Sequence, residues 1–245
     1  MVRAHPRGGR TLVKRPALVA LAVLFAGCAR GGHDGARLLP ADRSAAVTYV
    51  ALGDSTVEGI GASSLEHTYV SRVHARLRSV YPDARLANLG VSGATSALVL
   101  LRQLDRAIEL GPDLVTLSIG PNDITGRVSV ETYEKNLETI LGRLTDETTA
   151  VVVANLIPDL AVTPRFKGSP EQDAVAARTV RFNEALARRA RARGVQLVDL
   201  YTASQREVSR RPELVGPDGY HPSDAGYARW AALLWEGVEA RIASR

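Results

Sequence analysis

From Val47 onward, short apolar runs alternate with segments in which apolar residues recur every three or four positions. The runs are rich in aliphatic and β-branched residues and predict five strands: VTYVAL, ARLANLG, DLVTLSIG, TAVVVANLIP and VQLVDL. The segments between them predict helices: TYVSRVHARLRSVY, SALVLLRQLDRAIELG, SVETYEKNLETILGRL and residues 169–194, and a last helix has Tyr227, Trp230, Leu234 and Val238 on one face. Strands that alternate with helices favour an α/β fold with a parallel sheet covered on both faces.

The first 45 residues follow a different pattern. Residues 1–27 place a basic stretch before the apolar run PALVALAVLFAG, which has the length of a signal peptide and is short for a membrane span. The run ends in LFAGC at Cys28, so the segment resembles a bacterial lipoprotein signal, in which that cysteine becomes the lipidated N-terminus. The alternative is an ordinary secretory signal followed by a chance cysteine. We expect an exported cell-envelope lipoprotein anchored to a membrane through Cys28, or otherwise a secreted or periplasmic protein.

Residues 28–45 are rich in glycine and polar residues and show no sustained period, which predicts a flexible tether. Residues 46–245 then form a single folded domain. The chain after residue 27 carries no formal net charge: segment 1–27 has five basic residues and no acid, and the remaining chain has 26 basic and 26 acidic residues. A nucleic-acid partner therefore has little support, and we expect a monomer.

Metal and cofactor sites find no support in the sequence. The five histidines show no paired spacing of metal-ligand type, and the single cysteine excludes an intramolecular disulfide. The stretch GIGASS begins like a dinucleotide-binding fingerprint, but it has serine at the third glycine position and does not directly follow a strand. We therefore expect no cofactor and no metal.

The predicted strands end in loops that contain chemically useful residues. In parallel α/β sheets, ligands bind at the carboxyl ends of the strands, near the point where the strand order reverses. The loops at that edge read GDS, GVSGAT, GPND and IPDL, and the loop GPDGYHPSD precedes the last helix. A functional site is expected among these loops.

Ser55 in GDS is a candidate nucleophile. Asp218 and His221 lie three residues apart, so they can touch within one turn, and a serine nucleophile needs such a base and an acid to orient it. The alternatives are ordinary: a serine between strand and helix is most often a helix cap or a turn residue, and a histidine before proline is common in surface loops.

A hydrolytic serine also needs hydrogen-bond donors for the oxyanion that forms during the reaction. The loops provide the backbone N–H of Ser55, a backbone N–H at Gly93, and the side-chain amide of Asn122. Gly93 is expected to allow a close approach because it has no Cβ atom. Turn formation is the alternative explanation for Gly93 and Asn122.

The segments GDSTVEG, NLGVSGAT, GPND and DGYHP resemble the four signature blocks of the SGNH hydrolases, also called GDSL esterases and lipases, in the family's order. The resemblance extends from Leu52 to Pro222. It implies a three-layer, flavodoxin-like doubly wound sheet of five parallel strands. It also implies Ser55 as nucleophile, Asp218 and His221 as its partners, and Ser55, Gly93 and Asn122 as the oxyanion hole. Thr56 stands where the GDSL name expects leucine, and the G-x-S-x-G motif of the α/β-hydrolases is absent.

The expected function is hydrolysis of carboxylic esters through a Ser-His-Asp triad and an acyl-enzyme intermediate. Short loops favour small or exposed acyl groups, on a small-molecule, lipid or glycan ester. Three apolar residues after the fourth strand either shape the acyl pocket or pack beneath their loop: Leu160, Val162 and Phe166. Two alternatives are an O-acetyltransferase that uses the same serine on an envelope polysaccharide, and a binding module without enzymatic activity.

Overall fold

The computed structural model describes residues 1–2 and 36–244. The predicted signal peptide and Cys28 lie outside the described residues, so the fold concerns the compact unit Asp34–Arg245. None of the helices within residues 36–244 is long and apolar enough to cross a membrane.

A single parallel sheet of five strands forms the centre of this unit. The strands are β1 (Thr48–Gly53), β2 (Arg85–Asn88), β3 (Leu114–Ser118), β4 (Val151–Asn155) and β5 (Gln196–Val198). Their order in the sheet is β2-β1-β3-β4-β5, and every neighbouring pair is parallel. This arrangement confirms the fold predicted from the sequence. The chain moves from β1 to one side and then back to β3, so the strand order reverses between β1 and β3.

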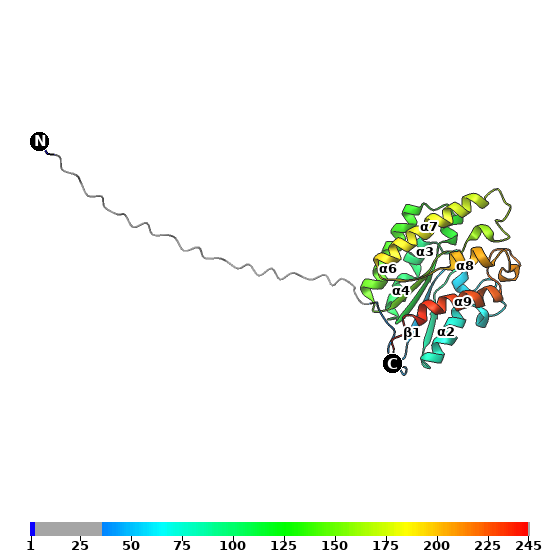
Figure 1. Ribbon diagram of the computed structural model, residues 1–245. Helices are drawn as coiled ribbons and strands as arrows, with labels where there is room; N and C mark the ends of the chain where they lie inside the picture. Colours follow the sequence, from blue (N-terminus) through cyan, green and yellow to red (C-terminus); the bar gives the residue numbers. More distant parts are fainter. Residues whose placement is uncertain (3–35, 245) are drawn as a thin grey trace. The chain divides into compact units, whose positions relative to one another are not determined.

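Helices cover both faces of the sheet (Figure 1). The α-helices are α1 (Ser55–Glu58), α2 (Tyr69–Val80), α3 (Ser96–Arg102), α4 (Leu104–Glu109), α5 (Pro121–Thr125), α6 (Val130–Glu147), α7 (Gln172–Ala192), α8 (Leu200–Glu207) and α9 (Asp224–Glu239). Three 3₁₀ turns are η1 (Leu65–His67), η2 (Leu160–Val162) and η3 (Pro212–Leu214). The single helix expected over residues 96–110 is divided into α3 and α4, and the sequence analysis did not anticipate α1, α5 or α8.

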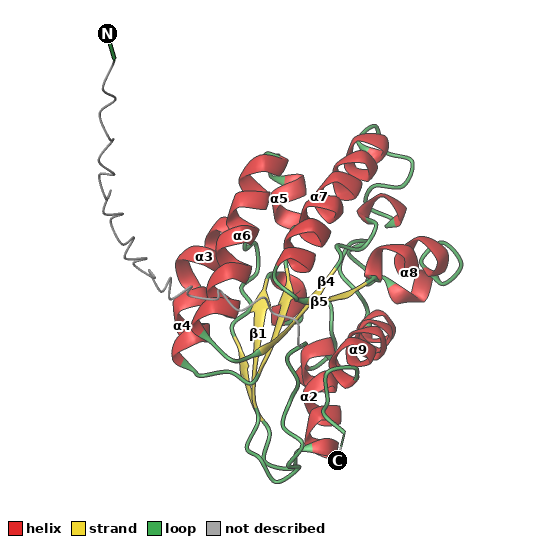
Figure 2. Ribbon diagram, turned by 60° about the vertical axis from the view of Figure 1, so that its left-hand side comes forward, coloured by secondary structure: helices red, strands yellow, loops and turns green. Residues whose placement is uncertain are grey.

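The alternation of side chains along the strands produces two apolar cores. In β1, Val50 and Leu52 point to the face covered by α3, α4, α6 and α7. Tyr49 and Ala51 point to the opposite face, which is covered by α2 and α9. Figure 2 shows the strands between these two groups of helices. Because both faces of the central strands are buried, β1, β3 and β4 read as nearly continuous apolar runs.

Part of the segment expected to be a flexible tether is packed on the domain. Leu39 is 1% exposed, and its backbone N–H donates to the carbonyl of Arg241 over 2.7 Å. The Arg37 guanidinium donates to the carbonyls of Thr145 and Thr148, over 2.5 and 2.8 Å. The folded domain therefore begins before residue 46, because these contacts bury an apolar side chain and satisfy carbonyls at the end of α6. Residues 28–35 of the expected tether lie outside the described residues.

Candidate active site

Ser55 is held on a sharp turn between β1 and α1. The N-cap of α1 is Asp54, whose carboxylate accepts a hydrogen bond from the Thr56 backbone N–H over 2.9 Å. Ser55 is therefore the first helical residue rather than the cap, and its side chain is only 7% exposed. Gly53 has a φ of +146°, and a Cβ atom there would lie 1.9 Å from the Ser118 carbonyl oxygen. Glycine is required at this turn because β1 and β3 approach so closely.

A buried glutamine supports this turn from below. The Gln103 side chain accepts from the Gly53 N–H over 2.9 Å and donates to the Gly53 carbonyl over 2.8 Å. Gln103 is 2% exposed and lies at the junction of α3 and α4. The Gln103 side chain therefore provides hydrogen-bond partners for both the N–H and the carbonyl of Gly53, the last residue of β1. The sequence analysis missed this residue, because a glutamine inside a helical pattern carries no signal of such a role.

His221 connects Ser55 to Asp218. Its Nε2 atom lies 2.9 Å from Ser55 Oγ, although the two residues are 166 positions apart, and its Nδ1 atom lies 2.5 Å from Asp218 Oδ2. The other carboxylate oxygen of Asp218 accepts from the backbone N–H of Tyr220 and of His221, each over 2.9 Å. A carboxylate at Nδ1 favours the tautomer whose Nε2 is free to accept the serine proton. The three residues singled out in the sequence therefore form one hydrogen-bonded chain.

The pKa of Asp218 is lower than its ordinary value. Partial burial raises this pKa, but the hydrogen bonds from the His221 ring and from the backbone N–H groups of Tyr220 and His221 outweigh that effect. The carboxylate therefore remains ionised at neutral pH, as required of a group that orients a base and stabilises its protonated form.

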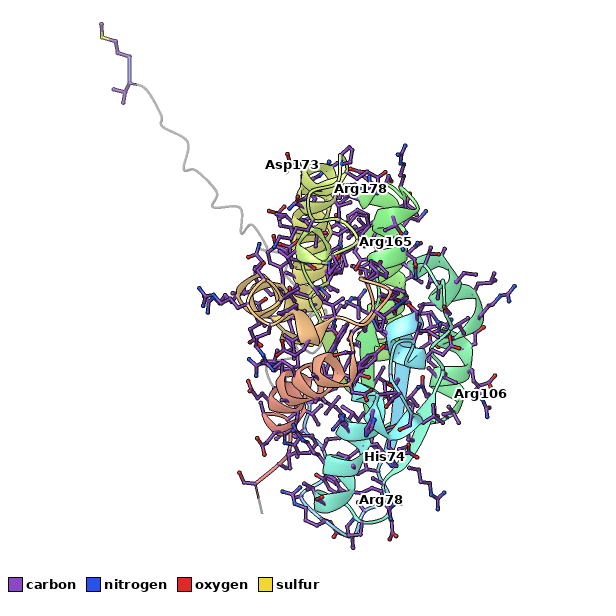
Figure 3. The ribbon with its side chains drawn as sticks, turned by 90° about the vertical axis from the view of Figure 1, so that its right-hand side faces the viewer. His74, Arg78, Arg106, Arg165, Asp173 and Arg178 are labelled. Carbon is purple, nitrogen blue, oxygen red and sulfur yellow. The ribbon has the colours of Figure 1, made fainter. Side chains whose placement is uncertain are left out.

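The loop that carries His221 is closed on itself and packed on a neighbouring loop. Within it, the Gly216 N–H donates to the His221 carbonyl over 2.7 Å. The Tyr220 ring meets the His221 ring at 80°, with the ring centroids 5.1 Å apart. The Arg165 guanidinium lies over the Tyr220 ring, 5.0 Å from its centroid, and Figure 3 labels Arg165. Tyr220 and Arg165 were not identified from the sequence, although Tyr220 stands inside the DGYHP block.

The predicted oxyanion donors Ser55, Gly93 and Asn122 follow β1, β2 and β3, respectively. Among the described residues, no acceptor is found for the backbone N–H of Ser55 or Gly93. The Asn122 amide donates to the Ala94 carbonyl over 2.9 Å, which uses one of its two N–H groups and joins α5 to the Gly93 loop. Gly93 has a φ of +76°, but no atom lies within 4 Å of a Cβ placed there. The loop therefore requires glycine for its left-handed backbone, and the space beside Gly93 is open on the side where a Cβ atom would stand.

A second network fixes the same loops. The Asp123 carboxylate accepts from the Ser96 backbone N–H over 2.9 Å and from its hydroxyl over 2.6 Å. The Asn136 amide also donates to the Ser96 hydroxyl over 2.9 Å. These bonds tie the start of α3 to α5, so Asn122 and Gly93 keep a fixed separation.

Asp54 is a buried carboxyl directly beside Ser55. Burial raises its pKa to about 6, although the hydrogen bonds from the Thr56 backbone and side chain act in the opposite direction. Its Oδ1 atom accepts both bonds from Thr56, whereas its Oδ2 atom has no partner among the described residues. Nothing in the sequence pattern distinguished Asp54 from an ordinary cap.

Other histidines do not join this group. The His67 ring is 2.7 Å from the Ser63 hydroxyl and 3.0 Å from the Asp224 carboxylate. His74 lies on α2, toward the opposite end of the domain from Arg165 (Figure 3). Within residues 36–244, no cluster of three or more histidine, cysteine, aspartate or glutamate side chains could hold a metal ion.

A cavity of about 110 Å³ opens beside Ser55 and His221. Its walls come from η2, α8, α9 and the loop before α9, and they are mostly aliphatic. Leu160 lines the cavity, as expected, whereas Phe166 is buried and packs edge-on against Tyr220, and Val162 is not part of the lining. The cavity gives an apolar group a place next to Ser55, which the short loops in the sequence did not suggest.

The parallel sheet with these residues at its switch point is the α/β architecture of the SGNH hydrolase fold. A model of the GDSL-like lipase/acylhydrolase family matches residues 51–229, and the chain belongs to this family. It is therefore a carboxylic ester hydrolase. No curated protein matches the chain in sequence.

Solved structures share this fold. An α/β-hydrolase enzyme from the metagenome of Lake Arreo, Spain, is 26% identical, with a TM-score of 0.66 over 82% of this chain and 98% of that one. An acetylxylan esterase from Geobacillus stearothermophilus is 22% identical, with a TM-score of 0.64 over 82% of this chain and 99% of that one. A lipase/acylhydrolase from Enterococcus faecalis is 22% identical, with a TM-score of 0.66 over 81% and 98%. The last two similarities concern the fold.

Proposed function

We propose that the protein is a serine esterase in which Ser55 attacks the carbonyl of a carboxylic ester. The observation that carries this proposal is the hydrogen-bonded chain from Ser55 Oγ through the His221 ring to the Asp218 carboxylate. A serine hydroxyl is a weak nucleophile until a base removes its proton, and His221 Nε2 lies within reach of that proton. The family membership supports ester hydrolysis as the reaction.

The reaction proceeds in two steps. His221 takes the Ser55 proton while the serine oxygen bonds to the ester carbonyl carbon, and His221 then gives this proton to the departing alcohol. Water, activated by His221 in the same way, attacks the acyl-serine and releases the carboxylic acid. Asp218 stabilises the imidazolium through its bond to Nδ1 in both steps.

The negative charge on the carbonyl oxygen is met by three donors at the ends of β1, β2 and β3. They are the N–H groups of Ser55 and Gly93 and the remaining N–H of the Asn122 amide. The contacts of Asn122 with Ala94 and of Asp123 with Ser96 hold these donors in place before substrate binds. Donors fixed in advance need no reorganisation when charge develops, which is the main advantage of such sites.

Hydrolysis of p-nitrophenyl butyrate by the wild type and by Ser55→Ala tests this proposal. The variant is expected to lose roughly 10³-fold or more in kcat, because the members of such a chain act as a unit. Circular dichroism establishes whether the variant is folded. A folded Ser55→Ala protein with wild-type activity would refute the assignment.

We further propose that the protein is exported and anchored to a membrane by a lipid on Cys28. The support is the order of a basic segment, an apolar run and LFAGC within residues 1–28. Full-length protein from a bacterial host is expected in the membrane fraction and to carry a lipid mass on Cys28. Cys28→Ser is expected to carry no lipid, and wild-type protein without a lipid mass on Cys28 would contradict the anchor.

A further inference from the structure

We propose that the groove between α8 and α9 binds the acyl chain of the substrate, and that it favours chains of about six to eight carbons. This inference rests on the proposed esterase function, because it assigns the acyl group that Ser55 carries. Both helices lie next to each other at the β5 side of the sheet in Figure 1 and Figure 2.

The groove begins at the reacting atoms. Ser55 and His221 both line the cavity of about 110 Å³, so a chain attached to the Ser55 oxygen can enter it directly. An acyl group stays bound to the serine until water releases it, whereas the alcohol departs before that step. A pocket that starts at the nucleophile therefore suits the acyl part, and the alcohol leaves by another route.

One face of each helix forms the walls. On α8, Leu200, Ala203 and Glu207 follow one another at helical spacing, and all three line the cavity. On α9, Gly226, Trp230 and Leu233 do the same. Seven residues advance an α-helix by about 10 Å, and an extended chain of about eight carbons covers a similar length given a C–C bond of about 1.5 Å.

Gly226 lets the first turn of α9 approach the end of η3. A Cβ atom at this position would lie 2.1 Å from the Leu214 carbonyl oxygen. Leu214 is buried and also lines the cavity. The wall near His221 is therefore closed by tight packing, which directs a bound chain along the helices.

An ion pair joins the two helices along the groove. The Arg229 guanidinium donates to the Glu207 carboxylate, with its Nε 3.0 Å from each carboxylate oxygen and its second donor nitrogen 2.7 Å from Oε1. Both side chains line the cavity. Their charges satisfy each other, and the carboxylate of Asp159, which also lines the cavity, accepts from the Ala161 N–H and the Gln205 amide. The occupant that matches it is a neutral hydrocarbon chain.

The volume of the cavity indicates the length of that chain. An engineered apolar cavity of about 150 Å³ in another protein binds benzene, a molecule of six carbons. In proportion, a cavity of about 110 Å³ holds about four carbons beyond the carboxyl carbon at Ser55, and the rest of a six- to eight-carbon chain follows the groove along α8 and α9. An acetyl group would leave most of the groove empty, and a twelve-carbon chain would exceed it.

The experiment compares p-nitrophenyl acetate, butyrate, hexanoate, octanoate and laurate on three purified proteins. They are the wild type, Ala203→Phe, which places a ring in the groove, and Ala177→Phe, the same change at an exposed position on α7. For the wild type, kcat/KM is expected to rise at least tenfold from acetate to hexanoate or octanoate and to fall for laurate. The octanoate-to-acetate ratio is expected to drop at least tenfold in Ala203→Phe and to stay unchanged in Ala177→Phe.

A second variant and a second substrate series complete the test. Leu233→Trp narrows the groove on α9, two helical turns after Gly226. It replaces Ala203→Phe in the comparison if that variant does not fold. Ethyl, butyl and octyl acetates vary the alcohol alone, and their kcat/KM is expected to differ by less than threefold. A wild-type optimum at acetate, an unchanged chain preference in a folded groove variant, or a dependence on the alcohol chain instead would overturn the proposal. Absence of hydrolysis for every ester would instead count against the esterase function itself.

Discussion

Gly61 lies directly against His221. A Cβ atom at Gly61 would come 3.1 Å from the Cβ of His221 and 2.6 Å from the Pro222 carbonyl oxygen. Nearby, the Tyr227 hydroxyl donates to the Ile60 carbonyl over 2.6 Å. The loop after Ser55 therefore packs against the loop that carries His221. This contact fixes the distance between the Ser55 nucleophile and the His221 base.

Gly61→Ala is expected to lower kcat by roughly 10–100-fold, because small displacements of a reacting group are costly. The unfolding free energy should also fall by about 1–3 kcal/mol, since Gly61 has a φ of +94°. Gly111→Ala is a matched control: its φ is +57°, and no atom lies within 4 Å of a Cβ there. It is expected to lose stability and keep kcat. Equal kcat in both variants would argue against the positioning role of Gly61.

Asn122→Ala is expected to reduce kcat by about 10²–10³-fold with little change in KM, because an oxyanion donor acts mainly in the transition state. Loss of the bond to the Ala94 carbonyl should cost only about 1 kcal/mol of stability. Steady-state kinetics with p-nitrophenyl butyrate and a urea titration measure the two effects separately. A large loss of stability with unchanged kcat would show a purely structural residue.

Asp218→Asn keeps an oxygen that can accept from the Tyr220 and His221 backbone N–H groups, so the loop is expected to stay folded. The amide cannot favour the same histidine tautomer or stabilise the imidazolium, and kcat should fall by about 10²–10⁴-fold. The thermal midpoint, measured by circular dichroism, should stay within a few degrees. Wild-type kcat in this variant would remove Asp218 from the proposed mechanism.

Asp54→Asn is expected to change how stability depends on pH. Burial raises the pKa of Asp54 to about 6, so the folded state takes up a proton more readily than the unfolded state between about pH 4 and pH 6. The contribution of this residue to stability therefore falls as pH rises through that window. The difference in unfolding free energy between the variant and the wild type should therefore shift in favour of the variant by roughly 1–3 kcal/mol from pH 4 to pH 7. Urea titrations at the two pH values measure it, and a constant difference would contradict the shift.

The periodic parts of the fold could be predicted from the sequence. The central strands β1, β3 and β4 are buried on both faces, so their apolar runs are unmistakable, and α2, α6, α7 and α9 repeat apolar residues at helical spacing. The break between α3 and α4 could not be predicted, because it follows from the position of Gln103 under the Gly53 turn. Helix α8 was missed because LYTASQRE directs its few apolar residues to a groove and not to a continuous core.

The site residues could be found because they are concentrated at strand ends, where the topology of a parallel sheet brings them together. For some of these site residues, the physical role became clear only from the structure. Gly93 was expected to allow a close approach to the reacting group, and the structure adds that its backbone is left-handed. Asp54 and Tyr220 stand within the motifs, yet only the three-dimensional arrangement shows that one is a buried acid and the other supports the His221 ring.

The central claim is that His221 activates Ser55 as a covalent nucleophile. The most direct measurement is peptide mass spectrometry after treatment with a fluorophosphonate, which bonds to an activated serine oxygen and releases fluoride. We expect one adduct per chain, located on Ser55, and a labelling rate at least 100-fold lower in His221→Ala. No adduct on Ser55 in the folded wild type, or labelling of another serine at the same rate in both proteins, would contradict the account.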